Sequence, residues 1–200
     1  MSPVERTTHG LHTEEHQMTT RQLRSEGSEA ENAALDSDLG KLFEHQLQDT
    51  YYAENAIAKA LPKMIKAARS GELKDAFEKH LTQTAGHVAR LESVFKMIGR
   101  KAEGTPCEAI KGIIREGDEI AAEFGKTQAG DAGLAAAAQA VEHYEIARYG
   151  ALKAWAHELG LAKAVTLLEA TEDEEIDTDQ LLSDLAAQFN ATAVGDEARS

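Results

Sequence analysis

The sequence predicts an all-α protein, a bundle of four long helices with a fifth, shorter helix in one connection. Ala, Leu, Glu, Gln and Lys are abundant, prolines number only 3, and the β-branched and aromatic runs typical of strands are missing. Apolar residues instead recur every three to four positions along four long stretches. The 200 residues suffice for one packed domain, expected at 37–190 between polar tails at 1–36 and 191–200.

The first two apolar stretches predict a helical hairpin. The first extends over 39–65, and Pro62 is expected to bend it near its end. The second extends over 73–98, and Gly99 follows it as a natural C-terminal stop. Ser70-Gly71 leaves only a short turn between the two helices, so they are expected to pack antiparallel.

A long connection separates this hairpin from the last two helices. The segment Thr105-Pro106-Cys107-Glu108 combines an N-cap threonine, a proline at the first helical position and a glutamate three residues after the cap. It predicts a shorter helix that ends near Phe124. Long helices at 131–159 and 161–189 follow. About thirty residues of connection can span the length of a bundle, which favours the ferritin-like order of two hairpins joined by a crossover.

The charge excludes some partners. Against 21 basic residues stand 35 acidic ones, and a net charge of -14 repels a phosphate backbone or an anionic membrane. No stretch has the roughly 20 consecutive apolar residues of a membrane helix, and the N-terminal stretch has no apolar segment typical of a signal peptide. We therefore expect a cytoplasmic protein that binds neither nucleic acid nor membrane.

Cysteine and histidine content narrows the metal chemistry. Cys107 is the only cysteine, which excludes an internal disulfide and a cysteine-based zinc site. His12 and His16 have the spacing of a helical metal pair, but no other ligand lies nearby, so a solvated tail is expected there. A metal would be held by carboxylates and imidazoles.

Every long helix carries polar residues at mid-length, where its apolar stripe calls for a hydrophobic side chain. These residues are Glu54 in the first helix, His80, Thr84 and His87 in the second, with Gln83 on the flank of its stripe, Glu142 and Glu145 in the third, and Glu175 and Asp179 in the fourth. One such glutamate alone would more simply be a core carboxylate with its own partners. An unpaired buried carboxylate costs several kcal/mol, so four facing helices favour a shared centre.

The spacing and type of these residues favour a metal. Glu142 and Glu145 lie three positions apart and Glu175 and Asp179 four, so each pair shares one face of its helix. Carboxylates with an imidazole suit iron or manganese, whereas an all-oxygen site would favour calcium or magnesium. His87 could be a ligand or a packed residue. A centre without metal, in which carboxyls share protons, stays open as the alternative.

Other polar residues are given simpler roles. His80 is expected to be packed or solvent-facing, and Glu172-Asp173-Glu174 to form a solvated face. His143 lies one step off the stripe and would support the centre or face a partner. Tyr51 and Tyr144 are expected to be core residues. The alternative is that they are redox-active side chains next to a metal.

Three segments resemble the YciE/YciF family of bacterial ferritin-like stress proteins. They are 49–54 (DTYYAE), 107–110 (CEAI) and 137–147 (AAQAVEHYEIA), and the resemblance extends over about 38–190. It implies a fold similar to that of rubrerythrin-type di-iron proteins, and a homodimer.

The resemblance also implies a set of metal residues. Position by position, the four inward glutamates and the aspartate of the last helix match the family pattern. The departure is Gln83, where the family usually has Glu, because a neutral amide weakens one metal position. The predicted metal-site residues are Glu54, Gln83, His87, Glu142, Glu145, Glu175 and Asp179.

Two functions follow as hypotheses. The first is a stress-associated protein with an iron or manganese centre, dinuclear or with one metal, related to redox or peroxide chemistry. The second is a non-enzymatic dimeric helical protein that acts through protein partners. Storage of iron in a closed shell is less expected, because dimer-forming relatives do not imply a cage. No residue specifies a substrate.

Overall fold

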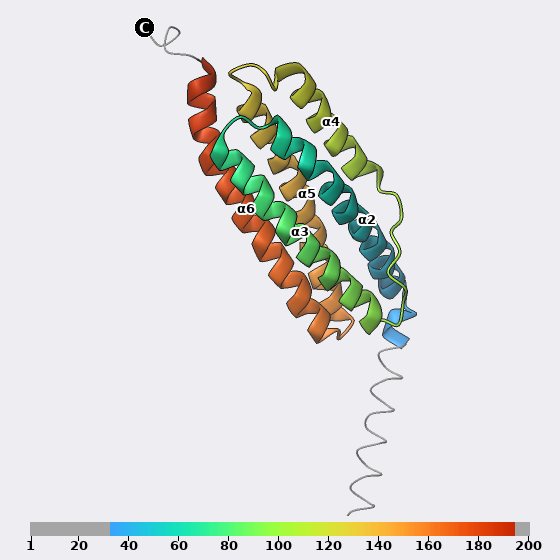
Figure 1. Ribbon diagram of the computed structural model, residues 1–200. Helices are drawn as coiled ribbons and strands as arrows, with labels where there is room; N and C mark the ends of the chain where they lie inside the picture. Colours follow the sequence, from blue (N-terminus) through green and yellow to red (C-terminus); the bar gives the residue numbers. More distant parts are fainter. Residues whose placement is uncertain (1–32, 195–200) are drawn as a thin grey trace, which may run out of the picture.

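The computed structural model describes residues 33–194, and this part of the chain is helical apart from short connections (Figure 1). A helical turn at 33–35 comes first. The helices that follow are α2 (Asp38–Ala67), α3 (Gly71–Met97), α4 (Glu108–Phe124), α5 (Gly130–Glu158) and α6 (Ala162–Val194). No strand occurs between residues 33 and 194, so the predicted all-α class is confirmed. None of these helices is both long and apolar enough to cross a membrane.

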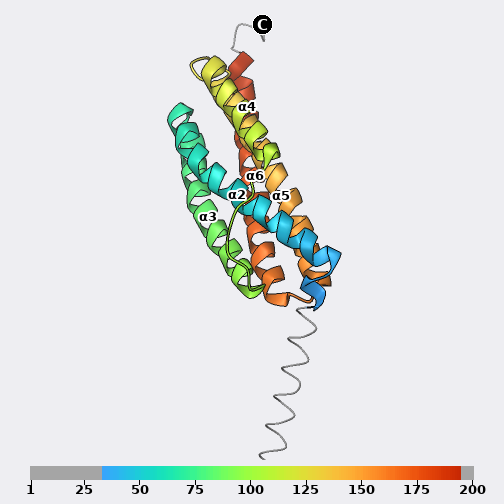
Figure 2. The same ribbon diagram turned by 90° about the vertical axis from the view of Figure 1, so that its right-hand side faces the viewer.

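The long helices form two hairpins. α2 packs against α3, α5 packs against α6, and contacts of α2 with α5 and of α3 with α6 close the four-helix bundle. α4 lies outside this bundle against α5 and α2, as Figures 1 and 2 show. The predicted crossover helix is therefore present, and it covers the α2–α5 side.

The core consists of two apolar clusters with a polar band between them. One cluster contains Leu61, Phe77 and Leu182, and the other contains Phe43, Leu91 and Leu152. Between them, all four long helices contribute buried polar side chains. The apolar clusters thus hold the helices together on both sides of the band and shield it from water.

Helix α4 begins later than predicted. It starts at Glu108 after Cys107, and the predicted N-cap, Thr105, lies in the irregular connection. The Thr105 amide donates to the Gln48 carbonyl of α2 at 3.3 Å instead. The connection also passes close to α2, since a Cβ at Gly104 would lie 3.0 Å from a Tyr52 side-chain atom. This docking fixes the backbone of the connection, so the helix begins only after it.

Two other helix features differ in extent. α2 continues through Pro62 to Ala67. α6 continues to Val194, past the predicted end at residue 189, so the expected boundary of the C-terminal tail at 191 falls inside the helix. The last residues of α6 include alanines, which favour helix without needing an apolar stripe.

Asp131, in the first turn of α5, holds the turn between α2 and α3. Its two carboxylate oxygens each accept a hydrogen bond of 2.8 Å, one from the Arg69 amide and one from the Ser70 amide. We predict that Asp131→Ala lowers the free energy of unfolding by about 1–3 kcal/mol, because both amides lose a charged acceptor. Urea unfolding of the metal-free chain measures this. Asp177→Ala, at an exposed position of α6, is the control, and equal losses in the two variants would contradict the prediction.

Candidate metal centre

Six ionisable side chains meet in the polar band. Glu54 comes from α2, His80 and His87 from α3, Glu142 and Glu145 from α5, and Glu175 from α6. None of the six is more than 2% exposed. The two α3 histidines are seven residues apart and the two α5 glutamates are three apart, so each pair shares one face of its helix. The helix register therefore aims all six side chains at one region.

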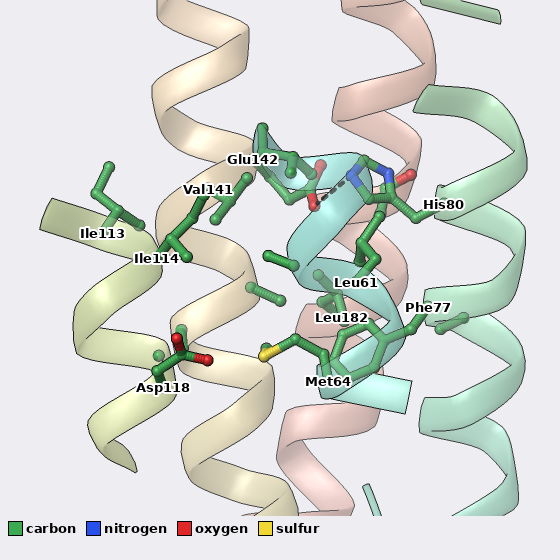
Figure 3. Close-up of a pocket in the computed structure, with 17 residues that line it drawn as sticks. Leu61, Met64, Phe77, His80, Ile113, Ile114, Asp118, Val141, Glu142 and Leu182 are labelled. Atoms are coloured by element: carbon green, nitrogen blue, oxygen red, sulfur yellow. Dashed lines mark ion pairs between the residues drawn. The ribbon is translucent and has the colours of Figure 1, made fainter. Parts of the chain in front are cut away.

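Four of them form the first of two groups, which we call group 1: His80, Glu142, Glu145 and Glu175. Each residue offers a ligand atom within 4.8 Å of all the others. The His80 Nε2 lies 3.5 Å from Glu142 Oε1 and 4.0 Å from Glu145 Oε2, and its Nδ1 lies 3.7 Å from Glu175 Oε2. Figure 3 shows His80 and Glu142 facing each other.

Group 2 consists of Glu54, His87 and Glu175, and its ligand atoms are equally close. The His87 Nδ1 lies 3.0 Å from Glu175 Oε1 and 3.4 Å from Glu54 Oε1. Glu175 belongs to both groups, since its Oε2 is the oxygen near His80 and its Oε1 the oxygen near His87. Its carboxylate therefore stands where it could bridge two cations.

Outer residues orient group 2. The Tyr149 hydroxyl donates to Glu54 Oε1, and the His87 Nε2 lies 2.9 Å from Glu174 Oε2. Arg90 donates to both Glu174 oxygens at 2.8 Å, and this pair lowers the pKa of Glu174 to about 2. The ionised Glu174 can only accept, so the Nε2 of His87 carries a proton and its Nδ1 points into the centre.

Burial controls the protonation of the centre. Loss of water raises the pKa of Glu54, and raises those of Glu142 and Glu145 well above the usual range, with nearby carboxylates adding to the effect. Burial lowers the pKa of His80. Burial also opposes charge on His87, but its contacts with Glu175 and Glu54 prevail and raise its pKa to about 10. Without a cation, these three glutamates thus tend to keep protons.

The donor atoms of the centre fit a metal. Nine of its buried atoms make no hydrogen bond: Glu54 Oε2, both ring nitrogens of His80, His87 Nδ1, Glu142 Oε2, and both carboxylate oxygens of Glu145 and Glu175. Buried polar atoms without partners cost about 1–3 kcal/mol each, so they rarely gather without a purpose. A divalent cation accepts lone pairs from carboxylate oxygens and from one nitrogen of a neutral imidazole, and this mixture of ligands is typical of iron and manganese.

Five of the seven predicted metal residues come together in these groups: Glu54, His87, Glu142, Glu145 and Glu175. Asp179 is in neither group: its Oδ1 accepts from Gln139 at 3.3 Å and pairs with His143 at 3.2 Å. Gln83 lies on the α3 face between the two histidines, and its Oε1 is buried without a hydrogen-bond partner.

Two side chains lie closer to the centre than expected. His80, expected to be packed or solvent-facing, is packed, and its neighbours are three glutamates, which makes it a member of group 1. Its position seven residues before His87 was the available signal. Glu174, expected on a solvated face, is bound by Arg90 and His87. Sequence spacing does not reveal a contact between α3 and α6, so this pair could not be predicted from it.

Of the remaining polar residues, Tyr149 contacts the centre, whereas Tyr51, Tyr144 and His143 belong to neither group. Tyr149 was predicted only as a stripe residue, although its place four positions after Glu145 puts its hydroxyl in the band. Tyr51 bonds Glu92 and Tyr144 lies beside Cys107, and both pack against the apolar clusters as expected. His143 is largely exposed. The pair of histidines at positions 12 and 16 lies outside the described residues.

The raised carboxyl pKa values give a pH dependence with a definite sign. A group whose folded pKa exceeds its unfolded value stabilises the fold fully below the unfolded pKa and loses that effect as pH rises through the folded pKa. We therefore predict that Glu145→Gln, in chelator-treated protein, gains unfolding free energy over wild type progressively as pH rises above the usual pKa range of a glutamate. Chemical denaturation at several pH values measures the difference. Glu116→Gln, at an exposed position of α4, should show no trend, and a flat difference for Glu145→Gln would refute the account.

Comparisons with known proteins agree with this architecture. Residues 38–194 match the sequence profile of a domain of unknown function, DUF892. Protein YciF of Escherichia coli strain K12 is 42% identical over 146 residues, which cover 72% of this chain and 88% of YciF. The resemblance found in the sequence is thereby confirmed.

Solved structures share the fold. The crystal structure of the E. coli stress protein YciF matches with a TM-score of 0.74 and 40% identity, covering 78% of this chain and 98% of YciF. YcfI from Rhodopseudomonas palustris, described as a candidate structural protein, matches with a TM-score of 0.71 and 46% identity, covering 74% and 94%. A protein from Xanthomonas campestris with 19% identity has a TM-score of 0.64 over 80% of this chain and 99% of its own, which shows the fold alone. The chain therefore belongs to the DUF892 family of YciF-like helical proteins.

Proposed function

We propose that this chain is a stress-associated protein that binds iron or manganese in the polar band, with one cation in group 1 and a second in group 2. The observation that carries the proposal is the set of nine buried donor atoms without hydrogen bonds. Glu175 contributes one oxygen to each group, so the two cations would share it.

Bound iron or manganese would supply one-electron chemistry toward dioxygen or a peroxide. Side chains around the centre hold its metal-binding residues in position. Tyr149 holds Glu54, and the Arg90–Glu174 pair holds His87, so the donors of group 2 need little reorganisation. The apolar clusters above and below the band keep bulk water out.

The two groups should differ in affinity. Group 1 has three carboxylates and an imidazole that burial keeps neutral, whereas group 2 has two carboxylates and an imidazole with a pKa of about 10. A histidine must lose its inner proton before it can bind a cation. Gln83 adds no negative charge on this helix. We expect group 1 to fill first and group 2 to bind more weakly. The affinity of both groups should rise with pH, because the carboxyls of group 1 must also lose protons before they bind a cation.

Metal content tests the proposal directly. Purified chain loaded anaerobically with Fe²⁺ or Mn²⁺, desalted and analysed for metal, should retain about two cations at saturation, and Glu175→Ala should lose most of both. Glu54→Ala should lose the cation of group 2 and keep that of group 1. Glu169→Ala, an exposed position on α6, is the matched control and should bind as wild type. Fewer than about 0.2 cations per chain, unchanged by Glu54→Ala, would refute the proposal.

Gln83→Glu tests the effect of the missing carboxylate. A glutamate at this position should tighten binding of the weaker cation about tenfold or more, because it adds a buried negative charge beside the imidazoles. The same charge should destabilise the metal-free chain, since nothing else neutralises it. Competition titration against a chelator and urea unfolding measure the two effects. Gln188→Glu, exposed on α6, is the control. Unchanged affinity with unchanged stability would show that this side chain lies outside the centre.

The second candidate function is a non-enzymatic one. It is favoured by the description of YcfI as a candidate structural protein. In that case the glutamates share protons, the centre holds no metal, and the chain acts through protein partners. The expected homodimer remains a prediction under both functions, and gel filtration with light scattering measures it.

A further inference from the structure

An apolar pocket lies under the crossover helix α4 and ends at group 1. Its volume is about 40 Å³, and side chains from α2, α3, α4, α5 and α6 form its wall. The wall includes Leu61, Met64, Phe77, Ile114, Val141 and Leu182, and its polar inner end is formed by His80 and Glu142 (Figure 3). The pocket therefore reaches two of the residues proposed to hold the cation of group 1.

The pocket opens toward the surface between α2 and α4. Ala60, Ile114 and Asp118 line both this pocket and a larger surface groove of about 430 Å³. Asp118 pairs with Lys63 at 3.2 Å, and both side chains are substantially exposed. The ion pair thus marks the rim, and the pocket lies between the groove and the buried centre.

Size and polarity restrict what the pocket can hold. A single water needs about 10–15 Å³ of such volume, so 40 Å³ leaves room for a molecule of only a few atoms. Between the rim and the inner end, Thr178 is the only polar side chain in the wall, and its hydroxyl already donates to the Glu174 carbonyl at 2.8 Å. Water or hydrogen peroxide would lose hydrogen bonds there, whereas an uncharged apolar molecule would not.

We propose that this pocket admits dioxygen from the α2–α4 groove and holds it beside His80 and Glu142. The proposal rests on the proposed function and specifies it, because it makes dioxygen rather than hydrogen peroxide the molecule that reaches the centre by this path. Xenon is the probe for the pocket, since small dry apolar cavities bind it without any chemistry.

Gly117 on α4 offers a way to close the pocket. It lines the pocket, and a Cβ there would meet only Ala137 Cβ at 3.5 Å and Met64 Sδ at 4.0 Å, both ordinary contacts. Gly117→Leu should therefore be tolerated on the backbone and direct its side chain into the space. Gly112→Leu is the matched control, because it lies on the same helix outside the pocket and its Cβ would meet nothing within 4 Å. Both variants gain the same helix propensity.

Xenon-pressurised crystals of the metal-free full chain test the pocket. We expect one xenon atom near Leu61, Met64 and Leu182 in wild type and in Gly112→Leu, and none in Gly117→Leu. No xenon at this place in wild type, or an unchanged xenon in Gly117→Leu, would overturn the proposal. Ordered water filling the pocket in wild type would do the same.

Oxidation of the Fe²⁺-loaded chain tests the path. The rate at which Gly117→Leu reacts with dioxygen should be about one-tenth of the Gly112→Leu rate or below. Its iron content and its rate with hydrogen peroxide should be the same as in Gly112→Leu. Equal slowing with both oxidants, or no slowing, would overturn the proposal. Xenon bound in a chain that takes up neither iron nor manganese would overturn the proposed function and the delivery role together. Normal metal binding without xenon would overturn the pocket's role alone.

Discussion

The free-energy cost of burying carboxylates is the constraint on which the rest of this structure depends. Four glutamates and two histidines lie in the middle of a helical bundle, none more than 2% exposed, and their contacts with one another do not satisfy them. A purely structural core would place apolar side chains there at lower cost. The apolar clusters on both sides must hold the helices together despite this band. Protons offset part of the cost in the metal-free chain, and a pair of cations would offset more of it.

The sequence was sufficient for the fold because each helix repeats its apolar stripe over many turns. The crossover also followed from the length of one connection. Helix ends were less predictable: Thr105 resembles an N-cap, but its amide bonds Gln48 on a distant helix, and no local pattern reveals that. Similarly, α6 continues past its last apolar stripe residue because its end needs only helix propensity.

The candidate metal centre, too, could be predicted from the sequence only in part. Glutamates at mid-stripe positions could be found from spacing, and they do converge. Asp179 has suitable spacing on its helix but turns to His143, since one face of a helix is broad enough to include positions at its margin. His80 and Tyr149 lie on the same helix stripes as residues predicted for the site. They were nevertheless expected to be packing residues, because a single histidine or tyrosine on a stripe is usually part of the core. The bond between Arg90 and Glu174 depends on the relative register of two helices, which the sequence alone does not fix.

The central claim is that Glu175 stands between two cations. Anomalous diffraction at the iron or manganese absorption edge, from crystals grown with the metal, locates such cations independently of any activity. The account predicts two peaks, one among His80, Glu142 and Glu145 and the other between Glu54 and His87, with the Glu175 carboxylate between them. A fully loaded crystal without a peak in the band, or with peaks only at surface carboxylates, would contradict it.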